Sequence, residues 1–391
     1  MFALYACTTG TVPHKPEEEK PAKAAAEKPP AAETIAATPP AAVESVPLPA
    51  PPVLPTVKPF PHIALLLPLE SPVFGPSADA VKQGFMAAIN PKRLLLPVHV
   101  YSNFDENSGV VAIYRQAIAN GARAVVGPIT RSGVSALAAE KDIPVPTLAL
   151  NIVEGQPAKQ LYFFGLSVEA EARQAAQLAK QQGLHQAIII TTRSQLSQRM
   201  QAAFEEEWSG TGRGILREIE FNDDPAVFAD IADITDTTVF LAVDAAKARL
   251  IRPYLPNKLP IYATSQIFAG NENTLTNYDL NGIRFVDMPW LLQPDHPAVM
   301  IYPRASPALS TDRERLYALG IDSFRLIQLL LADRVASAMP LDGVTGQIDL
   351  SGHTFQRTPI PAVFVQGRAQ LPNMPAAPTP QIFPDRSINT Q

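Results

Sequence analysis

The chain has 391 residues, of which 46% are hydrophobic and 18% are charged, and its formal net charge is −5. This apolar content suffices for one large core or two moderate ones. The acidic balance, with no long basic run, argues against a nucleic-acid partner. The single cysteine excludes an internal disulfide framework and a cysteine-based metal site, and no apolar run has the ~18 residues of a membrane-spanning helix.

The N-terminal part of the chain is dominated by proline and alanine. Proline has no backbone donor and restricts the residue before it. Few large apolar side chains are present here to offset the entropy of ordering. We therefore predict a disordered, extended linker over residues 8–60 and a shorter disordered tail of the same kind over residues 369–391.

Cys7 stands just ahead of this linker. The stretch Leu4-Tyr5-Ala6-Cys7 resembles a bacterial lipobox, in which a small residue precedes a cysteine that receives a lipid. A signal peptide needs an apolar core of ~7–15 residues, and too few residues precede Cys7 to supply one, so we expect the natural start to lie further upstream. We predict residues 1–7 as the remnant of a lipoprotein signal, with Cys7 as the lipidation site. The alternative is a lone cysteine without a role.

From about Pro61 onward, short apolar runs alternate with helical stretches. The predicted strands are His62–Leu69, Leu94–Tyr101, Ala122–Pro128 and Val145–Asn151. Between them, apolar residues at helical spacing predict a helix through Val81 and Phe85, a helix over Ser108–Asn120 and a short helix through Val134. This order predicts a parallel sheet with right-handed crossovers.

The pattern restarts after the short apolar run Tyr162–Leu166. Ser167 is the predicted cap of a helix that ends at Gly183, and a second helix runs through Met200, Phe204 and Trp208, with Trp208 in the core. Further strands are predicted at Gln186–Thr192, 215–221, Thr238–Asp244 and Lys258–Thr264. These elements predict a second sheet covered by helices.

A long helix and two closing strands complete the predicted fold. The pattern Thr311-x-x-Glu314 predicts a capping box that opens the helix, and residues 344–350 and 361–367 are the closing strands. We predict an α/β fold with two Rossmann-like lobes, each with a parallel sheet, over residues 61–368. The first lobe covers about 61–166 plus the C-terminal returns, and the second covers about 167–290.

Two α/β lobes joined by a hinge of several crossings resemble the type I periplasmic-binding-protein-like superfamily, and Ile63–Ile89 is similar to its first strand, loop and helix. The stretches YRQAIANGARAVVGPITRSGV (Tyr114–Val134) and PVPTLALN (Pro144–Asn151) resemble the LpoA family, outer-membrane lipoproteins that activate class A penicillin-binding proteins. The resemblance covers about residues 60–368 and corresponds to that family's C-terminal domain. Larger members carry a helical-repeat domain where this chain has its linker.

The resemblance implies a non-catalytic regulator of peptidoglycan synthesis whose partner is a class A penicillin-binding protein. It implies no cofactor, and a location at the periplasmic face of the outer membrane through a lipid at Cys7. The alternative is a periplasmic solute-binding protein of an ABC importer for amino acids or related small ligands. A third reading, an enzyme, is disfavoured because the sequence has no histidine pair at i, i+4, no Gly-x-Ser-x-Gly elbow and no phosphate-binding loop.

Ligands of open α/β sheets bind beyond the carboxyl ends of the strands, near helix N-termini. Residues predicted at such positions, and therefore candidates for a cleft ligand site, are Ser71, Phe74, Thr130, Arg131, Ser132, Asn151, Arg193, Asp244 and Ser265. Arg131 and Arg193 could clamp an anionic ligand from opposing lips. The alternative is that these residues only cap helices or face solvent. Trp290, in a proline-rich run, is predicted as an exposed contact for a partner.

Overall fold

The computed structural model describes residues 59–89, 95–102, 109–210, 212–232, 234–272 and 274–372. They belong to the compact unit that begins at Val57. The predicted lipidation site at Cys7, the linker as far as residue 58 and the tail from residue 373 lie outside the described residues.

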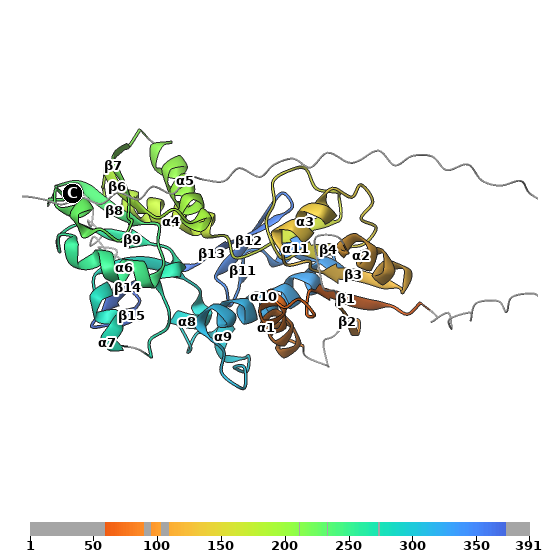
Figure 1. The fold of residues 1–391 in the computed structure, drawn as a ribbon. Helices are drawn as coiled ribbons and strands as arrows, with labels where there is room; N and C mark the ends of the chain where they lie inside the picture. Colours follow the sequence, from red (N-terminus) through yellow and green to blue (C-terminus); the bar gives the residue numbers. More distant parts are fainter. Residues whose placement is uncertain are drawn as a thin grey trace, which may run out of the picture. The chain divides into compact units, whose positions relative to one another are not determined.

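Two sheets carry the fold (Figure 1). Among the described residues, the first sheet has the strand order β11-β12-β13-β5-β4-β3-β1-β2 and the second has the order β15-β14-β10-β9-β8-β6-β7. The strands of the first sheet are β1 His62–Leu67, β2 Val98–Ser102, β3 Ala122–Val126, β4 Thr147–Ala149, β5 Leu161–Phe164, β11 Leu341–Asp342, β12 Gln347–Ser351 and β13 Thr354–Thr358. Those of the second sheet are β6 Gln186–Thr191, β7 Gly214–Glu220, β8 Thr237–Leu241, β9 Ile261–Ala263, β10 Ile283–Asp287, β14 Ile360–Val365 and β15 Arg368–Gln370.

Helices cover both faces of each sheet, as the alternating sequence pattern predicts. Residues Ile63 and Leu65 of β1 pack on one face with α1 and α10, whereas Ala64 and Leu66 pack on the other face with α2 and α3. In the second sheet, α4 and α5 cover one face and α6 the other. The helices are α1 Gly75–Ala87, α2 Val110–Ala119, α3 Arg131–Ala138, α4 Val168–Gln181, α5 Gln195–Ser209, α6 Ala245–Ile251, α7 Thr274–Asn277, α8 Pro289–Leu292, α9 Pro297–Met300, α10 Thr311–Leu331 and α11 Val335–Ala338.

The fold class predicted from the sequence is confirmed, with one refinement. The pairings among β1 to β5 and among β6 to β10 are parallel, but the C-terminal strands add antiparallel pairs, between β12 and β13 and between β10 and β14. The chain crosses between the sheets after β5, after β10 and after β13. Both β14 and β15 therefore belong to the second sheet, beyond the predicted bound of the second lobe at residue 290. The strand β15 also extends into the predicted tail, as far as Gln370.

Helices α1 and α10 lie side by side in the first lobe (Figure 1). They approach so closely because each presents a glycine to the other's backbone. A Cβ atom added at Gly84 would lie 1.8 Å from the carbonyl oxygen of Tyr317, and one added at Gly320 would lie 2.1 Å from the carbonyl oxygen of Val81. The contact allows no side chain at either position.

The predicted capping box of the long helix is wrong. Ser310 is the N-cap residue of α10, and its side chain makes no capping hydrogen bond. Thr311 is already helical, and the carboxylate of Glu314 instead accepts a hydrogen bond from the indole nitrogen of Trp290 at 2.5 Å. In a capping box the carboxylate of Glu314 would accept from the backbone at the start of its own helix. Here it accepts from the side chain of Trp290, which lies in another helix.

The predicted exposure of Trp290 is also wrong. Its side chain is 0% exposed, and it stacks on Tyr317 with the ring centroids 5.4 Å apart. The guanidinium of Arg304 lies over its ring at 3.8 Å. The prolines around Trp290 suggest a surface loop, but Pro289 begins the short helix α8, which turns the indole inward to meet Glu314. Trp208, in contrast, is buried as predicted.

Candidate functional site

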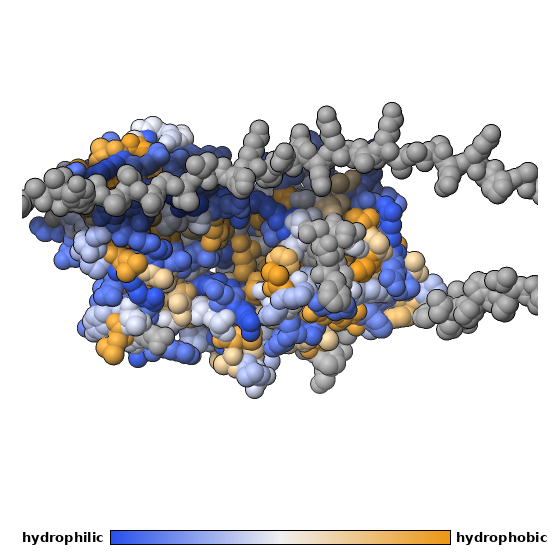
Figure 2. Space-filling view, viewed as in Figure 1, coloured by the Kyte–Doolittle hydropathy of each residue, from blue (hydrophilic) through white to orange (hydrophobic). Residues whose placement is uncertain are grey.

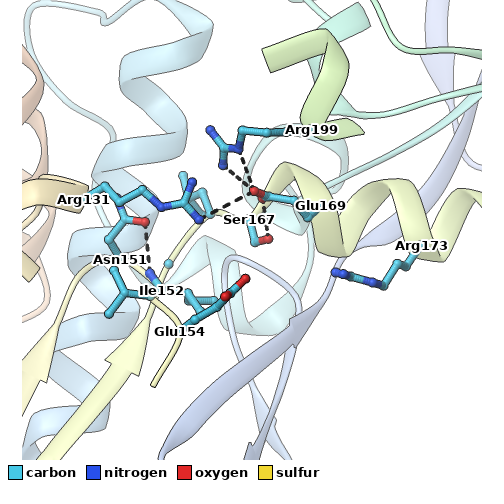
Figure 3. A pocket seen from close by; sticks show the side chains of 11 residues that line it. Arg131, Asn151, Ile152, Glu154, Ser167, Glu169, Arg173 and Arg199 are labelled. Carbon is cyan, nitrogen blue, oxygen red and sulfur yellow. Dashed lines mark hydrogen bonds and ion pairs between the residues drawn. The ribbon is translucent and has the colours of Figure 1, made fainter. Parts of the chain in front are cut away.

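A hollow of about 230 Å³ lies where the two lobes meet. Its first-lobe wall comes from the N-terminal end of α3 and the segment that follows β4, and its second-lobe wall comes from α4 and α5 (Figure 3). Its polar lining residues are Arg131, Asn151, Glu154, Ser167, Glu169, Arg173 and Arg199. We call this hollow the interlobe pocket.

A carboxylate from the protein itself stands between Arg131 and Arg199, two of the three arginines that line this pocket (Figure 3). Glu169 lies 2.5 Å from a terminal guanidinium nitrogen of Arg199 and 3.9 Å from one of Arg131. Ser167 donates a hydrogen bond of 2.9 Å to the same carboxylate. Because Arg131 begins α3 and Glu169 lies in the first turn of α4, the ion pair of 3.9 Å connects the two lobes across the pocket.

The pKa of Glu169 lies below its ordinary value of 4.5. Burial alone raises this pKa, but the backbone hydrogen bond and the hydrogen bonds from Arg199 and Ser167 favour the charged form more strongly. Glu169 is therefore a carboxylate at neutral pH, where it can neutralise part of the positive charge of the arginines.

A second hollow, of about 460 Å³, continues from the interlobe pocket between α4 and β13. The two hollows share Ile152, Gly165, Ser167 and Arg173 as lining residues. We call this second hollow the α4–β13 groove.

Buried charges lie beneath the groove. Glu171 of α4 forms an ion pair with Arg357 of β13, and their side chains are only 3% and 4% exposed. The other carboxylate oxygen of Glu171 accepts a hydrogen bond of 3.0 Å from the backbone nitrogen of Ser265. This pair joins a helix of the second lobe to a strand of the first.

A second buried ion pair adjoins the first. Arg315 of α10 lies 2.7 Å from the carboxylate of Asp287 and donates to the carbonyl oxygens of Ser265 and Phe268 at 2.9 and 2.7 Å. Burial lowers the pKa of Arg315, but the charge and hydrogen bonds of Asp287, together with the charges of Asp312 and Glu171, outweigh this effect, so the pKa is raised and the side chain stays a cation. Ser265 thus links the two pairs, one through its nitrogen and one through its carbonyl oxygen.

The structure brings together two of the nine predicted cleft residues in the interlobe pocket, Arg131 and Asn151. Asn151 does not point freely into it, because its side chain accepts from the nitrogen of Ile152 at 2.9 Å and donates to the carbonyl oxygen of Ile129 at 3.1 Å. Ser265 is 2% exposed and takes part in the buried charge network instead.

The other predicted residues have local roles. Thr130 caps α3 and accepts from the nitrogen of Gly133 at 3.1 Å, with the hydroxyl of Ser132 at 3.3 Å from its own. Asp244 caps α6, and Ser71 accepts from the nitrogen of Phe74 at 3.2 Å. None of these residues lines the interlobe pocket.

Arg131 and Arg193 do not form a clamp, and for Arg193 the alternative holds, that its side chain faces solvent. Arg193 is outside the lining of the interlobe pocket, and its exposed guanidinium pairs with Glu220 at 2.7 Å. Glu169, which pairs with Arg131, also pairs with Arg199, and Arg199 lies in α5.

Sequence reasoning missed the charged residues at the start of α4. Ser167 does cap this helix as predicted, accepting from the nitrogen of Ala170 at 3.1 Å. A signal for Glu171 was available, because it lies four residues before Ala175 and thus on the buried stripe of the helix. A carboxylate on such a stripe needs a buried partner. The partner, Arg357, lies 186 residues further along the chain, and no local pattern identifies it.

Within the described ranges, no three histidine, cysteine or carboxylate side chains converge as a metal site. Among the helices of that same part of the chain, none has the length and apolar character that a bilayer crossing requires.

We expect Glu169→Gln to loosen the contact between the lobes without unfolding either one. The amide cannot pair with Arg131 and Arg199, so hydrogen exchange in the first turn of α4 should become about five-fold faster, which is ~1 kcal/mol. In the wild type, the pKa of Glu169 is depressed, so the pair should persist above pH 4.5 and weaken as the pH falls through the lower folded-state pKa.

The matched control is Glu220→Gln, which breaks the exposed pair with Arg193 inside the second lobe and should leave exchange in α4 unchanged. Equal exchange in wild type and Glu169→Gln would contradict a role for this carboxylate between the lobes.

Comparison with known proteins identifies the family. The family model described as "LppC putative lipoprotein" matches residues 54–238 and 230–357. Among curated relatives, the penicillin-binding protein activator LpoA of Photobacterium profundum is 29% identical over 329 residues, covering 74% of this chain and 53% of that protein. LpoA of Haemophilus influenzae is 28% identical over 300 residues, covering 73% and 50%. The chain thus spans about half the length of the curated relatives it matches.

Solved structures are similar in fold. A protein of Chromobacterium violaceum that is described as a "putative branched-chain amino acid ABC transporter" is 37% identical, with a TM-score of 0.67, covering 78% of this chain and 99% of that one. The C-domain of Haemophilus influenzae LpoA, named as a regulator of PBP1A, is 25% identical, with a TM-score of 0.67, covering 79% and 99%. Because the family model matches well over half of its residues, this chain belongs to the LppC lipoprotein family.

Proposed function

We propose that this chain is a non-catalytic envelope lipoprotein that binds a class A penicillin-binding protein and activates its synthesis of peptidoglycan. Several relatives carry the name of such an activator. The C-domain of one of them has the same fold and is named as a regulator of PBP1A. Since the chain matches only about half of those relatives' length, the partner and the activity are part of the proposal.

The observation that carries this proposal over the import alternative is the position of Glu169. The carboxylate of Glu169 lies between Arg131 and Arg199, in the position where the carboxylate of a bound solute would form its ion pairs. Such a junction suits a domain that presents a fixed surface to a partner.

The second candidate is the solute-binding protein of an ABC importer, for an amino acid or a related small ligand. It is favoured by the 37% identity to a protein that carries a transporter's name. The arginines that line the interlobe pocket, however, already have carboxylate partners within the chain, which are Glu169 for Arg199 and Arg131 and Glu206 for Arg173. The first candidate therefore predicts that the chain binds a protein, and the second predicts that it binds a small molecule.

Anchoring is a further part of the proposal. A lipid on Cys7 would hold the chain at the periplasmic face of the outer membrane, and residues 8–60 would tether the folded part to the anchor. On the face of the molecule drawn in Figure 2, hydrophilic residues predominate and apolar ones form small separate groups. A partner contact on this face would accordingly be mixed in character, as transient interfaces are.

The test is a titration of the full chain, made as Cys7→Ser so that no lipid is needed, against the purified class A penicillin-binding protein of the same organism. Glycan polymerisation and peptide cross-linking are measured in parallel, and the same preparation is titrated with free amino acids. We expect saturable binding with a faster rate of at least one reaction. Amino-acid binding without any effect on the synthase would establish the import alternative, and neither kind of binding would overturn both.

A further inference from the structure

The cover of the second sheet is incomplete at one corner. The strands β14 and β15 extend the sheet beyond β10 (Figure 1), whereas α4 packs over β9 and β10. Successive residues of β14 point to opposite faces. Ala362 and Phe364 belong to the core cluster beneath α6, but Val363 and Val365 belong to neither core cluster of this sheet, and Val365 is 40% exposed. On the α4 side, β14 therefore presents β-branched apolar side chains that no helix covers.

Arginines flank this apolar strip on both sides. Val363 lies opposite Arg284 of β10, and Val365 lies opposite Arg368 of β15. Directly opposite residues of an antiparallel pair share one face of the sheet. That face is the α4 side, because the guanidinium of Arg284 lies 5.7 Å from the centre of the Tyr262 ring, which packs with α4 and α5. We call this surface the β14 face, and its residues are Arg284, Pro361, Val363, Val365, Arg368 and Gln370.

The charge of the β14 face is not neutralised from within the chain. Among the described residues, neither Arg284 nor Arg368 has a carboxylate partner. Elsewhere on the second lobe, the guanidinium groups of Arg173 and Arg193 each lie 2.7 Å from a carboxylate. Arg284 and Arg368 are two strands apart, which is ~10 Å across the sheet. The β14 face thus has an apolar centre between two cations that await an acidic partner.

The edge of β15 is less available than the β14 face. The backbone nitrogen of Ala369, in the middle of this three-residue strand, donates to the side-chain oxygen of Asn271 at 2.8 Å. An extended peptide that added to the edge as a further strand would have to displace this hydrogen bond. The side chains of the β14 face are open to contact without any such displacement.

We propose that the β14 face is a docking surface for an acidic segment of a partner protein, one that presents apolar side chains between two carboxylates. The apolar side chains cover Val363 and Val365, and the carboxylates pair with Arg284 and Arg368. A second copy of this chain fits less well, because a symmetric contact would place like charges against each other. The identification of the partner as a class A penicillin-binding protein rests on the proposed function.

The test titrates the full chain, made as Cys7→Ser, against the purified class A penicillin-binding protein of the same organism. We expect Arg284→Gln/Arg368→Gln to weaken binding by about tenfold or more, because each exposed ion pair contributes up to about fivefold. Raising the salt from ~50 mM to ~300 mM should weaken wild-type binding, and should weaken binding of the double variant less. Val365→Asp, at an exposed position, should also weaken binding by about tenfold, because its carboxylate would face those of the partner.

Arg217→Gln is the matched control. Arg217 is exposed on β7, at the opposite edge of the same sheet, and it too lacks a carboxylate partner among the described residues. This variant should bind with wild-type affinity. The thermal midpoint of each variant is measured first, and the exposed Val365→Asp tests the β14 face even if the double variant folds poorly.

The outcomes separate the β14 face from the proposed function. Wild-type binding that neither Val365→Asp nor the double variant weakens would overturn the β14 face and leave the proposed function intact. A wild type that does not bind the synthase at all would overturn both. Vesicles of phosphatidylglycerol are the second probe, and sedimentation reports self-association. Vesicle binding as tight as synthase binding, or a dimer, that the double variant abolishes would assign the face to a membrane or to a second copy, and either result would overturn the proposal.

Discussion

Gly320→Ala should strongly destabilise the first lobe, although alanine is the better helix former. In an open helix this change would stabilise by ~1 kcal/mol. Here the new Cβ atom would lie 2.1 Å from the carbonyl oxygen of Val81 and 2.7 Å from the backbone nitrogen of Phe85. Both are backbone atoms, so no rotation of a side chain relieves the clash, and α1 and α10 must separate. We expect a loss of ~3 kcal/mol or more in the free energy of unfolding, at the upper end of overpacking effects.

The measurement is urea unfolding followed by circular dichroism, with Gly84→Ala as a second variant at the same crossing. Its Cβ would lie 1.8 Å from the carbonyl oxygen of Tyr317, so it should show a loss of similar size. Gly210→Ala is the control, because Gly210 has an ordinary helical φ of −56° and its nearest atom would be 3.2 Å away. Unchanged midpoints for both crossing variants would contradict the close approach of the two helices.

This crossing illustrates what the sequence could and could not predict. The apolar stripes of α1 and α10 are visible as local periodicity, and so is the alternation of strands and helices that defines each lobe. The meeting of Gly84 with Gly320 is a contact between residues far apart in the chain. A glycine inside a helical pattern reads locally as a weakness, and only the three-dimensional packing makes it a requirement.

The same limit applies to the site. Sequence position correctly placed Arg131 and Asn151 near the carboxyl ends of strands, which is where open α/β sheets bind ligands. Sequence position also predicts Arg193 at such a strand end. Its exposed guanidinium instead pairs with a nearby carboxylate, that of Glu220. The predicted exposure of Trp290 is wrong for a related reason. The prolines around it are visible in the sequence, but its contacts with Glu314 and Arg304 form only in the folded chain.

The second large effect concerns the buried pair of Glu171 and Arg357. Arg357→Met should leave the carboxylate of Glu171, only 3% exposed, without a cation. Removing one partner of a buried pair costs ~3–5 kcal/mol, because the other charge stays desolvated. Since the pair joins α4 of one lobe to β13 of the other, we expect calorimetry to show one unfolding transition for the wild type and two for this variant, one for each lobe.

The double variant Glu171→Leu/Arg357→Met separates the charge from the packing. Replacing both partners by apolar residues of similar volume removes the desolvation cost together with the attraction, which is often neutral for stability. The backbone nitrogen of Ser265 loses its acceptor in this variant, so we expect recovery to within ~1–2 kcal/mol of the wild type and not beyond it. Losses that simply add in the double variant would mean that the two charges are not coupled.

The double variant also has a functional consequence that follows from the same geometry. If the pair serves only to hold α4 against β13, a chain that regains stability without it should match the wild type in the proposed binding and activation of a class A penicillin-binding protein. Glu171→Gln should be destabilised about as much as Arg357→Met, because the buried Arg357 loses its carboxylate although the amide oxygen can still accept from Ser265. Activation that is lost in the stable double variant would instead assign the buried charges a direct part in regulation, through the position of the first turn of α4 and the carboxylate of Glu169 that it carries.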